Sequence, residues 1–264
     1  KGGTCLIKSY LGYYRFSEDI DFTWKNQNVF KEMSQKQIRR YLSEVIGQIG
    51  ETLEKTGMDF ISDKGNKNYV ELTGGNKTAT FKLWYDSETL KYRTFVKIQI
   101  NFVEKLLFPS TRRKMHSLLY KKELQNIEDV FPDEYKEYSK DILFSAYDIR
   151  EILCEKIRAI LTRRGSKARD FVDIHMICTE YDLEIQDLES QIIDKTRFIL
   201  KMYRRYRENI MEKMRLIEKE DLFEWGNEKN LLLQEIDENS FYEFMDRLNE
   251  NLTVISKSVL GRMN

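Results

Sequence analysis

The sequence reads Arg15-Phe16-Ser17-Glu18-Asp19-Ile20-Asp21-Phe22 near its beginning, and acidic and apolar side chains alternate at the end of this segment. Alternation of this kind is typical of a strand, here from Asp19 to Trp24. Because neighbouring side chains of a strand point to opposite faces, Asp19 and Asp21 are expected on one face, with Ile20 and Phe22 toward the core. Two carboxylates side by side repel each other unless a cation lies between them. Mg²⁺ prefers oxygen ligands and is commonly held by one or two carboxylates together with substrate phosphates. The segment therefore predicts a site for Mg²⁺ (or Mn²⁺) on Asp19 and Asp21. The alternative is a surface strand that happens to carry two acids.

A glycine turn precedes this strand. Gly2, Gly3 and Thr4 stand before an apolar helix pattern from Thr4 to Tyr14. Glycines let backbone amides approach a phosphate closely, and the N-terminus of a helix favours anions. Together, the turn and the two acids predict a nucleoside triphosphate site with Gly2, Gly3 and Thr4 at the phosphates. A Gly-Gly turn at this position also predicts a further strand upstream of Lys1.

The first half of the sequence alternates helix and strand patterns, and the second half is mainly helical. The expected elements of the first half are a long amphipathic helix over Val29 to Lys55 and strands over Met58 to Ser62, Tyr69 to Thr73, Thr78 to Tyr85 and Thr94 to Val103. The expected helices of the second half cover Asp148 to Arg163, Lys167 to Thr179, Asp187 to Tyr206 and Glu238 to Val259. These patterns predict an α+β fold: a mixed-sheet domain over residues 1–140, followed by a helical domain over 141–264.

One lysine of the second half lies where an apolar side chain is expected. On a helical wheel of Asp148 to Arg163, Lys156 falls within the apolar stripe, whereas Glu151, Glu155 and Arg158 occupy the opposite, solvent-facing side. A lysine among apolar side chains is costly unless it meets an anion. The pattern indicates either a lysine that points into an anionic cleft or one whose ammonium group reaches out to solvent.

The next helix carries two acids close to its apolar side. Asp170 and Asp173 are three residues apart, so they lie on neighbouring positions of one face. They are candidates for active-site carboxylates. The alternative is a structural pair that binds Arg163, Arg169 or Lys156.

Several of these motifs resemble the AbiEii/AbiGii toxin family of nucleotidyltransferases. The first match is Gly-Gly-Thr followed by Arg-Phe-Ser-Glu-Asp-Ile-Asp-Phe. The second is Glu155-Lys156-Ile157 followed by Arg169-Asp170-Phe171-Val172-Asp173, so the resemblance covers residues from Lys1 to Ile174. It implies that Arg15 and Ser17 shape the loop that presents the two acids. It also implies that Lys156 contacts the nucleotide phosphates and that Asp170 or Asp173 helps to complete the site.

The resemblance further implies the DNA polymerase β-like nucleotidyltransferase superfold, many members of which place a third carboxylate on a later strand. The best candidate strand here, Thr94 to Val103, offers Lys97, Gln99 and Asn101 on its polar face. Either Asp170 or Asp173 supplies the third carboxylate, or the enzyme works with two. The general base stays unassigned.

The activity that this resemblance implies is Mg²⁺-dependent transfer of NMP from an NTP to an acceptor hydroxyl, with the 3′ end of tRNA as the first choice. A cognate antitoxin protein is the implied partner. One alternative is transfer to a protein or to a small molecule, as in antibiotic-modifying nucleotidyltransferases. Another is a catalytically inactive member of the fold that binds a partner.

The composition limits where the chain works and what it binds. Lys+Arg and Asp+Glu both number 44, so a net charge of zero offers no global signal for nucleic acid, although Lys201 to Arg207 combines basic residues with tyrosines. That cluster is either a solvated helix face or an RNA-binding surface. No apolar run is long enough to cross a bilayer. Cys5, Cys154 and Cys178 show no metal-binding or disulfide spacing, which favours reduced thiols in a cytoplasmic protein.

Overall fold

The fold was analysed in a computed structural model, which describes residues 1–119, 125–203 and 205–261. The chain divides into two compact units. The first, called the sheet unit, contains Lys1–Cys5 and Ser17–Leu106. The second, called the helical unit, contains Leu6–Phe16 and Leu107–Asn264. Sequence patterns instead placed the division near residue 140. The structure differs because residues 111–115 pair with residues 142–146, which ties the connecting segment to the helical unit.

The sheet unit has a four-stranded mixed sheet in the order β1-β4-β3-β2. Its elements are β1 (Ile20–Thr23), η1 (Gln27–Phe30), α2 (Gln35–Glu54), β2 (Val70–Thr73), β3 (Thr78–Asp86) and β4 (Arg93–Asn101). The short helix α1 (Gly2–Ser9) begins in this unit and ends in the helical unit. Strand β1 runs parallel to β4, and the other neighbours are antiparallel. The predicted mixed sheet is therefore confirmed.

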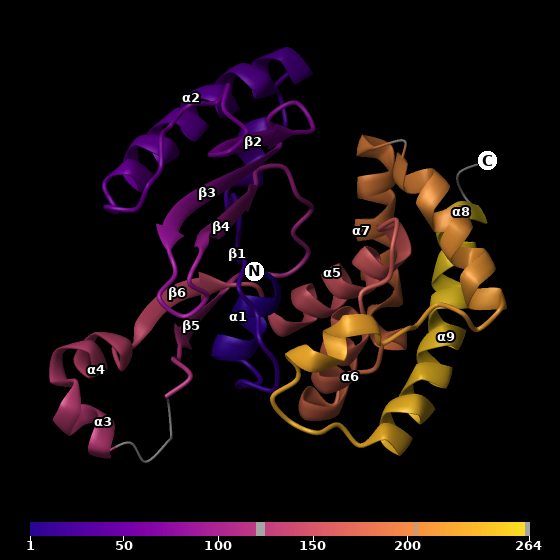
Figure 1. The fold of residues 1–264 in the computed structure, drawn as a ribbon. Coiled ribbons are helices and arrows are strands. Elements are labelled where there is room, and N and C mark those ends of the chain that lie inside the picture. Colours follow the sequence, from indigo (N-terminus) through magenta and orange to yellow (C-terminus); the bar gives the residue numbers. More distant parts are fainter. Residues whose placement is uncertain (120–124, 204, 262–264) are drawn as a thin grey trace. The chain divides into compact units, whose positions relative to one another are not determined.

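Helix α2 covers one face of this sheet (Figure 1). The predicted amphipathic character is confirmed: Ile38, Leu42, Val45 and Ile46 form a buried stripe that packs in one core with strand residues, including Phe81. The helix begins later than predicted because Ser34 caps it: Ser34 and Gln37 form a reciprocal capping box. The predicted strand Met58 to Ser62 is wrong, since only Asp59 bridges to the sheet, at Trp84.

The helical unit contains a small antiparallel ribbon and a helix bundle. Its elements are β5 (Thr111–Met115), α3 (Gln125–Val130), α4 (Pro132–Tyr138), β6 (Ile142–Ala146), α5 (Ile149–Thr162), α6 (Ala168–Tyr181), η2 (Gln186–Leu188), α7 (Glu189–Met202), α8 (Arg205–Glu218), η3 (Gly226–Leu231) and α9 (Glu238–Gly261). Sequence patterns missed the β5–β6 ribbon. They also merged α7 and α8, which are separate helices.

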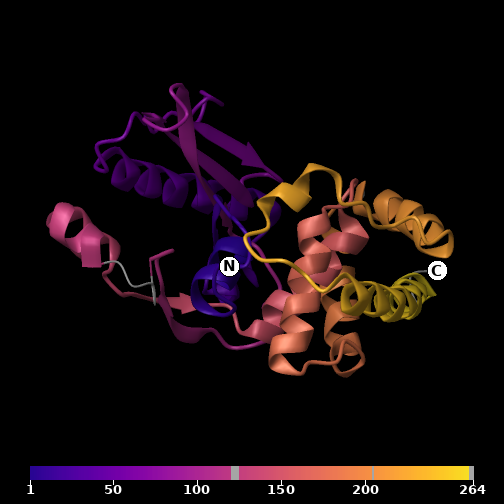
Figure 2. The same ribbon diagram turned by 60° about the horizontal axis from the view of Figure 1, so that its bottom comes forward.

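Helix α5 is the centre of the bundle and contacts α6, α7, α8 and α9 (Figures 1 and 2). The expectation that Glu151 and Arg158 face solvent was therefore wrong, whereas Glu155 is partly exposed. Glu151 is fully buried and forms an ion pair with the equally buried Lys195 of α7, at 2.6 Å. Its second carboxylate oxygen accepts backbone hydrogen bonds from Leu107 and Phe108. A central helix has no free side, so its polar residues must find partners within the protein.

Candidate active site

The two acids of the opening segment lie at the start of the edge strand β1. Asp19 directly precedes the strand, and Asp21 is its second residue and stands opposite Gln99 of β4. Their spacing places both on the same face of the strand, as the sequence predicted. The prediction that Phe22 is in the core was wrong, because 49% of its surface is exposed. An edge strand has a neighbour on only one side, which leaves this ring uncovered.

The glycine turn lies directly against the second acid. Gly2 has a φ of +80°, and a Cβ atom at this position would lie 2.3 Å from Asp21 Oδ2. Glycine is required here both for its backbone conformation and for this close approach. The turn continues into the first residues of α1, where Gly3 and Thr4 lie.

Thr4 joins this turn to the loop that leads into β1. Its hydroxyl donates a hydrogen bond to the carbonyl oxygen of Asp19 at 2.5 Å and shares another with Ser17 Oγ at 3.0 Å. The predicted phosphate-binding turn and the acids are thus held together within the sheet unit. Ser17 therefore contacts the threonine of the predicted phosphate-binding turn.

A lysine from the neighbouring strand β4 forms an ion pair with Asp19, one of the two acids. Lys97 Nζ of β4 lies 2.7 Å from Asp19 Oδ2, and both side chains are partly exposed, at 31% and 39%. The sequence patterns identified Lys97 only as a residue that stands on the strand where a third acid was sought. Lys97 and Gln99 lie on the same face of β4, and Gln99 is paired with Asp21 of β1. This pairing of the two strands would have placed Lys97 beside the acids.

The donors present fit a hard divalent cation. Asp19 and Asp21 offer carboxylate oxygens, and the described residues donate no hydrogen bond to the Asp21 carboxylate. Those residues contain no cluster of three or more metal-binding side chains. Two carboxylates match the way Mg²⁺ is commonly held, with substrate phosphates and water completing its shell.

A second group of predicted residues meets in the helical unit. Arg15 forms a bidentate ion pair with Asp173, with Nε–Oδ1 at 2.6 Å and Nη2–Oδ2 at 2.7 Å. Lys156 lies 2.5 Å from Asp173 and 2.7 Å from Asp170. Arg163 binds the other oxygen of Asp170. The anion that the misplaced lysine required is thus supplied by the two acids of α6.

Asp173 has no free lone pair directed at solvent. Tyr14 donates a hydrogen bond to its Oδ1 at 2.6 Å, in addition to the bonds from Arg15 and Lys156, and the residue is fully buried. Burial alone would raise the pKa of Asp173, but the charges of Lys156 and Arg15 outweigh it and hold that pKa below its ordinary value. The same balance lowers the pKa of Asp170, through Lys156 and Arg163. Both acids are therefore ionised at neutral pH.

This charged cluster favours the structural alternative for Asp173. Three cations, Arg15, Lys156 and Arg163, surround two acids, so the cluster carries a net charge of +1. Arg15, which the resemblance assigned to the loop before the acids, is only 1% exposed and donates hydrogen bonds to Asp173 and to the carbonyl oxygen of Phe16. Arg163 is the most open member, with 43% of its side chain exposed.

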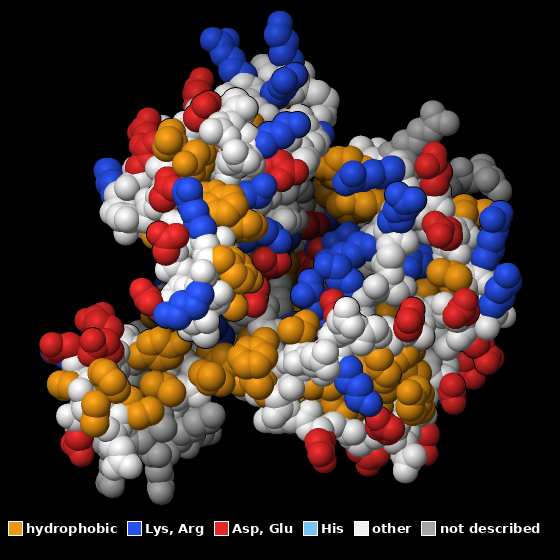
Figure 3. Space-filling view, viewed as in Figure 1, with side chains coloured by type: hydrophobic (Ala, Val, Ile, Leu, Met, Phe, Trp, Pro, Cys, Tyr) orange, Lys and Arg blue, Asp and Glu red, His pale blue; other side chains and the backbone are white. Residues whose placement is uncertain are grey.

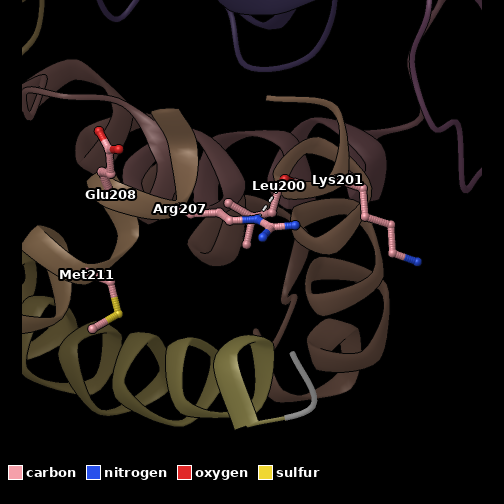
Figure 4. Close-up of a pocket in the computed structure, with 5 residues that line it drawn as sticks. All are labelled: Leu200, Lys201, Arg207, Glu208 and Met211. Atoms are coloured by element: carbon pink, nitrogen blue, oxygen red, sulfur yellow. Dashed lines mark hydrogen bonds between the residues drawn. The ribbon is translucent and has the colours of Figure 1, made fainter. Parts of the chain in front are cut away.

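The predicted basic and tyrosine cluster lies at the junction of α7 and α8, and its Arg204 falls outside the described residues. Lys and Arg side chains gather on the helical unit over α5 and α7 (Figure 3). A shallow pocket at the junction is lined by Leu200, Lys201, Arg207, Glu208 and Met211. Arg207 donates a hydrogen bond to the carbonyl oxygen of Leu200, while Lys201 points away from the other four side chains (Figure 4).

The model of one protein family, described as the nucleotidyl transferase AbiEii toxin of type IV toxin–antitoxin systems, matches residues 1–254. The chain belongs to the AbiEii family. Membership extends the resemblance from the first 174 residues to almost the whole sequence, including the helices beyond Glu180. No curated protein and no solved structure matches the chain. As an AbiEii family member, the chain is a nucleotidyltransferase toxin by class, and its family implies an antitoxin partner. No helix among its described residues is long and apolar enough to cross a membrane.

Proposed function

We propose that this protein transfers NMP from an NTP to an acceptor hydroxyl in a Mg²⁺-dependent reaction, with the 3′ end of tRNA as acceptor. The observation that carries the proposal is the joint placement of Asp19, Asp21 and the Gly2 turn. Two acids on one face of a strand, against a glycine turn at a helix N-terminus, provide a place for a metal–triphosphate complex. We also propose that the sheet unit is a polymerase β-like catalytic fold.

The chemistry requires positioning and charge stabilisation more than covalent catalysis by the protein. The acceptor oxygen forms a bond to the α-phosphorus, the bond from that phosphorus to the bridging oxygen breaks, and pyrophosphate leaves. The hydroxyl proton is released to solvent. When held by Asp19 and Asp21, Mg²⁺ supplies Lewis-acid stabilisation of the charge that develops on the phosphate.

The remaining residues have roles that follow from their contacts. Thr4 and Ser17 hold the loop that presents Asp19, and Gly2 leaves room for the Asp21 carboxylate. Lys156 pairs with Asp170 and Asp173, and its charge keeps both acids ionised. Asp173 acts as a positioning residue, because it fixes Arg15 and Lys156 and has no free oxygen for a metal or a proton.

The test is incubation of the protein with each labelled NTP, Mg²⁺ and total RNA. A labelled tRNA band is expected. Asp19→Asn and Asp21→Asn should each reduce labelling by about a hundredfold or more, because each removes a negative charge that would hold the Mg²⁺ ion that stabilises the transition state. The matched control is Asp86→Asn, which neutralises an exposed acid at the far end of β3.

Other outcomes would change the proposed acceptor, the proposed site or the proposed activity. Label on protein or on a small molecule would replace tRNA as the acceptor and leave the transferase chemistry intact. Full activity of either Asp variant would refute the site. Absence of Mg²⁺-dependent NTP binding by calorimetry would indicate an inactive, partner-binding member of the fold.

A further inference from the structure

The loop between α5 and α6 is a run of exposed residues without an acid. Arg163, Arg164, Gly165, Ser166 and Lys167 are all exposed. Arg163 is held by Asp170, whereas Arg164 and Lys167 form no ion pair with any described residue. Burial lowers the pKa of Lys167, the nearby charges of Arg169 and Arg163 lower it further, and those of Asp170 and Glu228 offset part of this effect. Positive charge is thus concentrated here beyond what the protein neutralises.

Helix α8 runs alongside this loop and fixes it at two points. Asn209 donates a hydrogen bond to the carbonyl oxygen of Thr162 at 2.7 Å, at the end of α5. One turn later, Lys213 donates a hydrogen bond to Ser166 Oγ at 2.7 Å. Because residues four apart share a helix face, Arg205, Asn209 and Lys213 form one stripe along the loop.

Lys213 is a buried cation without an anionic partner. The residue is only 1% exposed, and among the described residues its ammonium group meets no carboxylate, only the Ser166 hydroxyl. Burial lowers its pKa, and the nearby charge of Glu212 offsets this only in part. A buried ammonium that keeps two donors unused is costly unless it serves an anion at the loop.

One further feature fits an RNA chain. At the other end of the stripe, Arg205 lies over the rings of Tyr203 and Tyr206, at 5.8 Å and 5.0 Å. Tyrosine rings and arginine planes are the groups on which unpaired bases stack.

We propose that the α5–α6 loop and the first half of α8 bind the phosphate backbone of an RNA, through Arg164, Lys167 and Arg205, with Lys213 holding Ser166 beneath them. This proposal rests on the proposed function, since it gives the RNA acceptor its binding surface. Phosphates contact the loop, and bases stack near Arg205. Lys and Arg side chains gather on this unit over α5 and α7, as Figure 3 shows.

The experiment measures binding of fluorescein-labelled tRNA by anisotropy, in EDTA and without NTP, over a range of salt concentrations. The triple variant Arg164→Ala, Lys167→Ala, Arg205→Ala should raise Kd at least tenfold at low salt. The slope of log K against log salt should fall by about two, because fewer counterions are released on binding. Lys213→Met, which leaves every exposed charge in place, should raise Kd at least threefold.

The matched control removes three exposed charges elsewhere: Lys36→Ala, Arg39→Ala, Arg40→Ala on α2. Its Kd should stay within twofold of wild type. Three results would overturn the proposal: no RNA binding by the wild type, unchanged binding by the loop variant, or equal loss in both triple variants.

Measuring binding without NTP or metal separates this proposal from the proposed function. RNA binding that falls in the loop variant, in a protein without transfer activity, supports this surface and contradicts the transferase proposal. Transfer to tRNA together with unchanged tRNA binding by the loop variant supports the transferase proposal and contradicts this surface.

Discussion

Lys97 Nζ of β4 lies 2.7 Å from Oδ2 of Asp19, so an ammonium group occupies one carboxylate of the proposed metal pair. Asp19 directly precedes β1, which runs parallel to β4, and the two residues are separated by 78 positions in the sequence. At the proposed metal site, a divalent cation would compete with this ammonium group for the same carboxylate. We therefore propose that Lys97 lowers the cost of keeping Asp19 and Asp21 close together without a metal, and that it weakens metal binding.

Lys97→Met should strengthen binding of Mn²⁺. Both side chains are partly exposed, and such an ion pair is worth about 0.2–1 kcal/mol, so the Kd should fall by about 1.4- to fivefold. The measurement is titration followed by electron paramagnetic resonance of free Mn²⁺. Lys82→Met is the control, because Lys82 pairs with Glu71 instead. An unchanged or weaker Mn²⁺ affinity in Lys97→Met would refute the competition.

Gly2→Ala should abolish nucleotidyl transfer by displacing the Asp21 carboxylate, since the new methyl group would lie 2.3 Å from Oδ2. Gly75→Ala is the matched control. It has a similar positive φ of +67° but nothing within 4 Å of its added Cβ. Both variants carry a backbone cost of about 1–2 kcal/mol. Transfer rate and Mn²⁺ affinity are compared, and equal losses in the two variants would show that strain, not displacement of Asp21, is responsible.

Asp173→Asn should destabilise the protein by about 3–5 kcal/mol, because it leaves the buried Arg15 and Lys156 without their shared anion. Urea unfolding measures this change. Glu228→Gln, at the partly exposed Arg169 pair, is the control and should cost at most about 1 kcal/mol. A loss below 1 kcal/mol in Asp173→Asn would show that the cluster does not hold the unit together.

The same carboxylate makes the stability of the wild type depend on acid pH. The pKa of Asp173 in the folded state lies below its ordinary value of 3.8, so the unfolded chain takes up the proton first as the pH falls. The contribution of the Asp173 carboxylate to the free energy of unfolding is complete above about pH 4. It is lost as the pH falls through the pKa of the folded state. In Asp173→Asn, the free energy of unfolding should therefore fall less steeply as the pH is lowered in the acid range. An unchanged dependence on pH would contradict the assignment.

Lys213→Met should raise the unfolding free energy by about 1 kcal/mol, because it removes a buried charge that has no anionic partner among the described residues. The lowered pKa of Lys213 gives a second signature. Stability in the wild type should rise with pH between the folded pKa and 10.5, since the unfolded chain keeps the proton longer. The variant should lack this rise, which urea unfolding at alkaline pH measures. Loss of stability at neutral pH would contradict the prediction.

Cys154 and Cys178 should resist alkylation in the folded protein. Burial raises the pKa of each thiol to about 12, so about one molecule in 10⁵ carries the reactive thiolate at pH 7. Mass spectrometry after iodoacetamide treatment should find both labelled only in urea. Labelling of Cys154 within minutes in the native state would show that α5 opens readily.

Local sequence patterns predicted much of the sheet unit. The alternation around Asp19 and Asp21, the stripe of α2 and the polar face of β4 all arise from periodicities of neighbouring residues, and the structure confirms them as elements. The short β5–β6 ribbon was missed, because Thr111–Met115 and Ile142–Ala146 carry weak patterns and pair across a long segment. Such pairing depends on contacts distant in sequence, which no local period records.

The sequence by itself determined the family, the acid pair with its glycine turn, and the need of Lys156 for an anion. Only the tertiary structure decided which anion it meets, that Tyr14 and Arg15 saturate Asp173, and that Lys97 occupies Asp19. It also decided that Glu151 is buried, because α5 is surrounded on all sides. The physical reason is common to these cases. The spacing of residues along a helix or strand defines which side chains lie on one face. The charge that such a side chain meets depends on which distant element packs against that face.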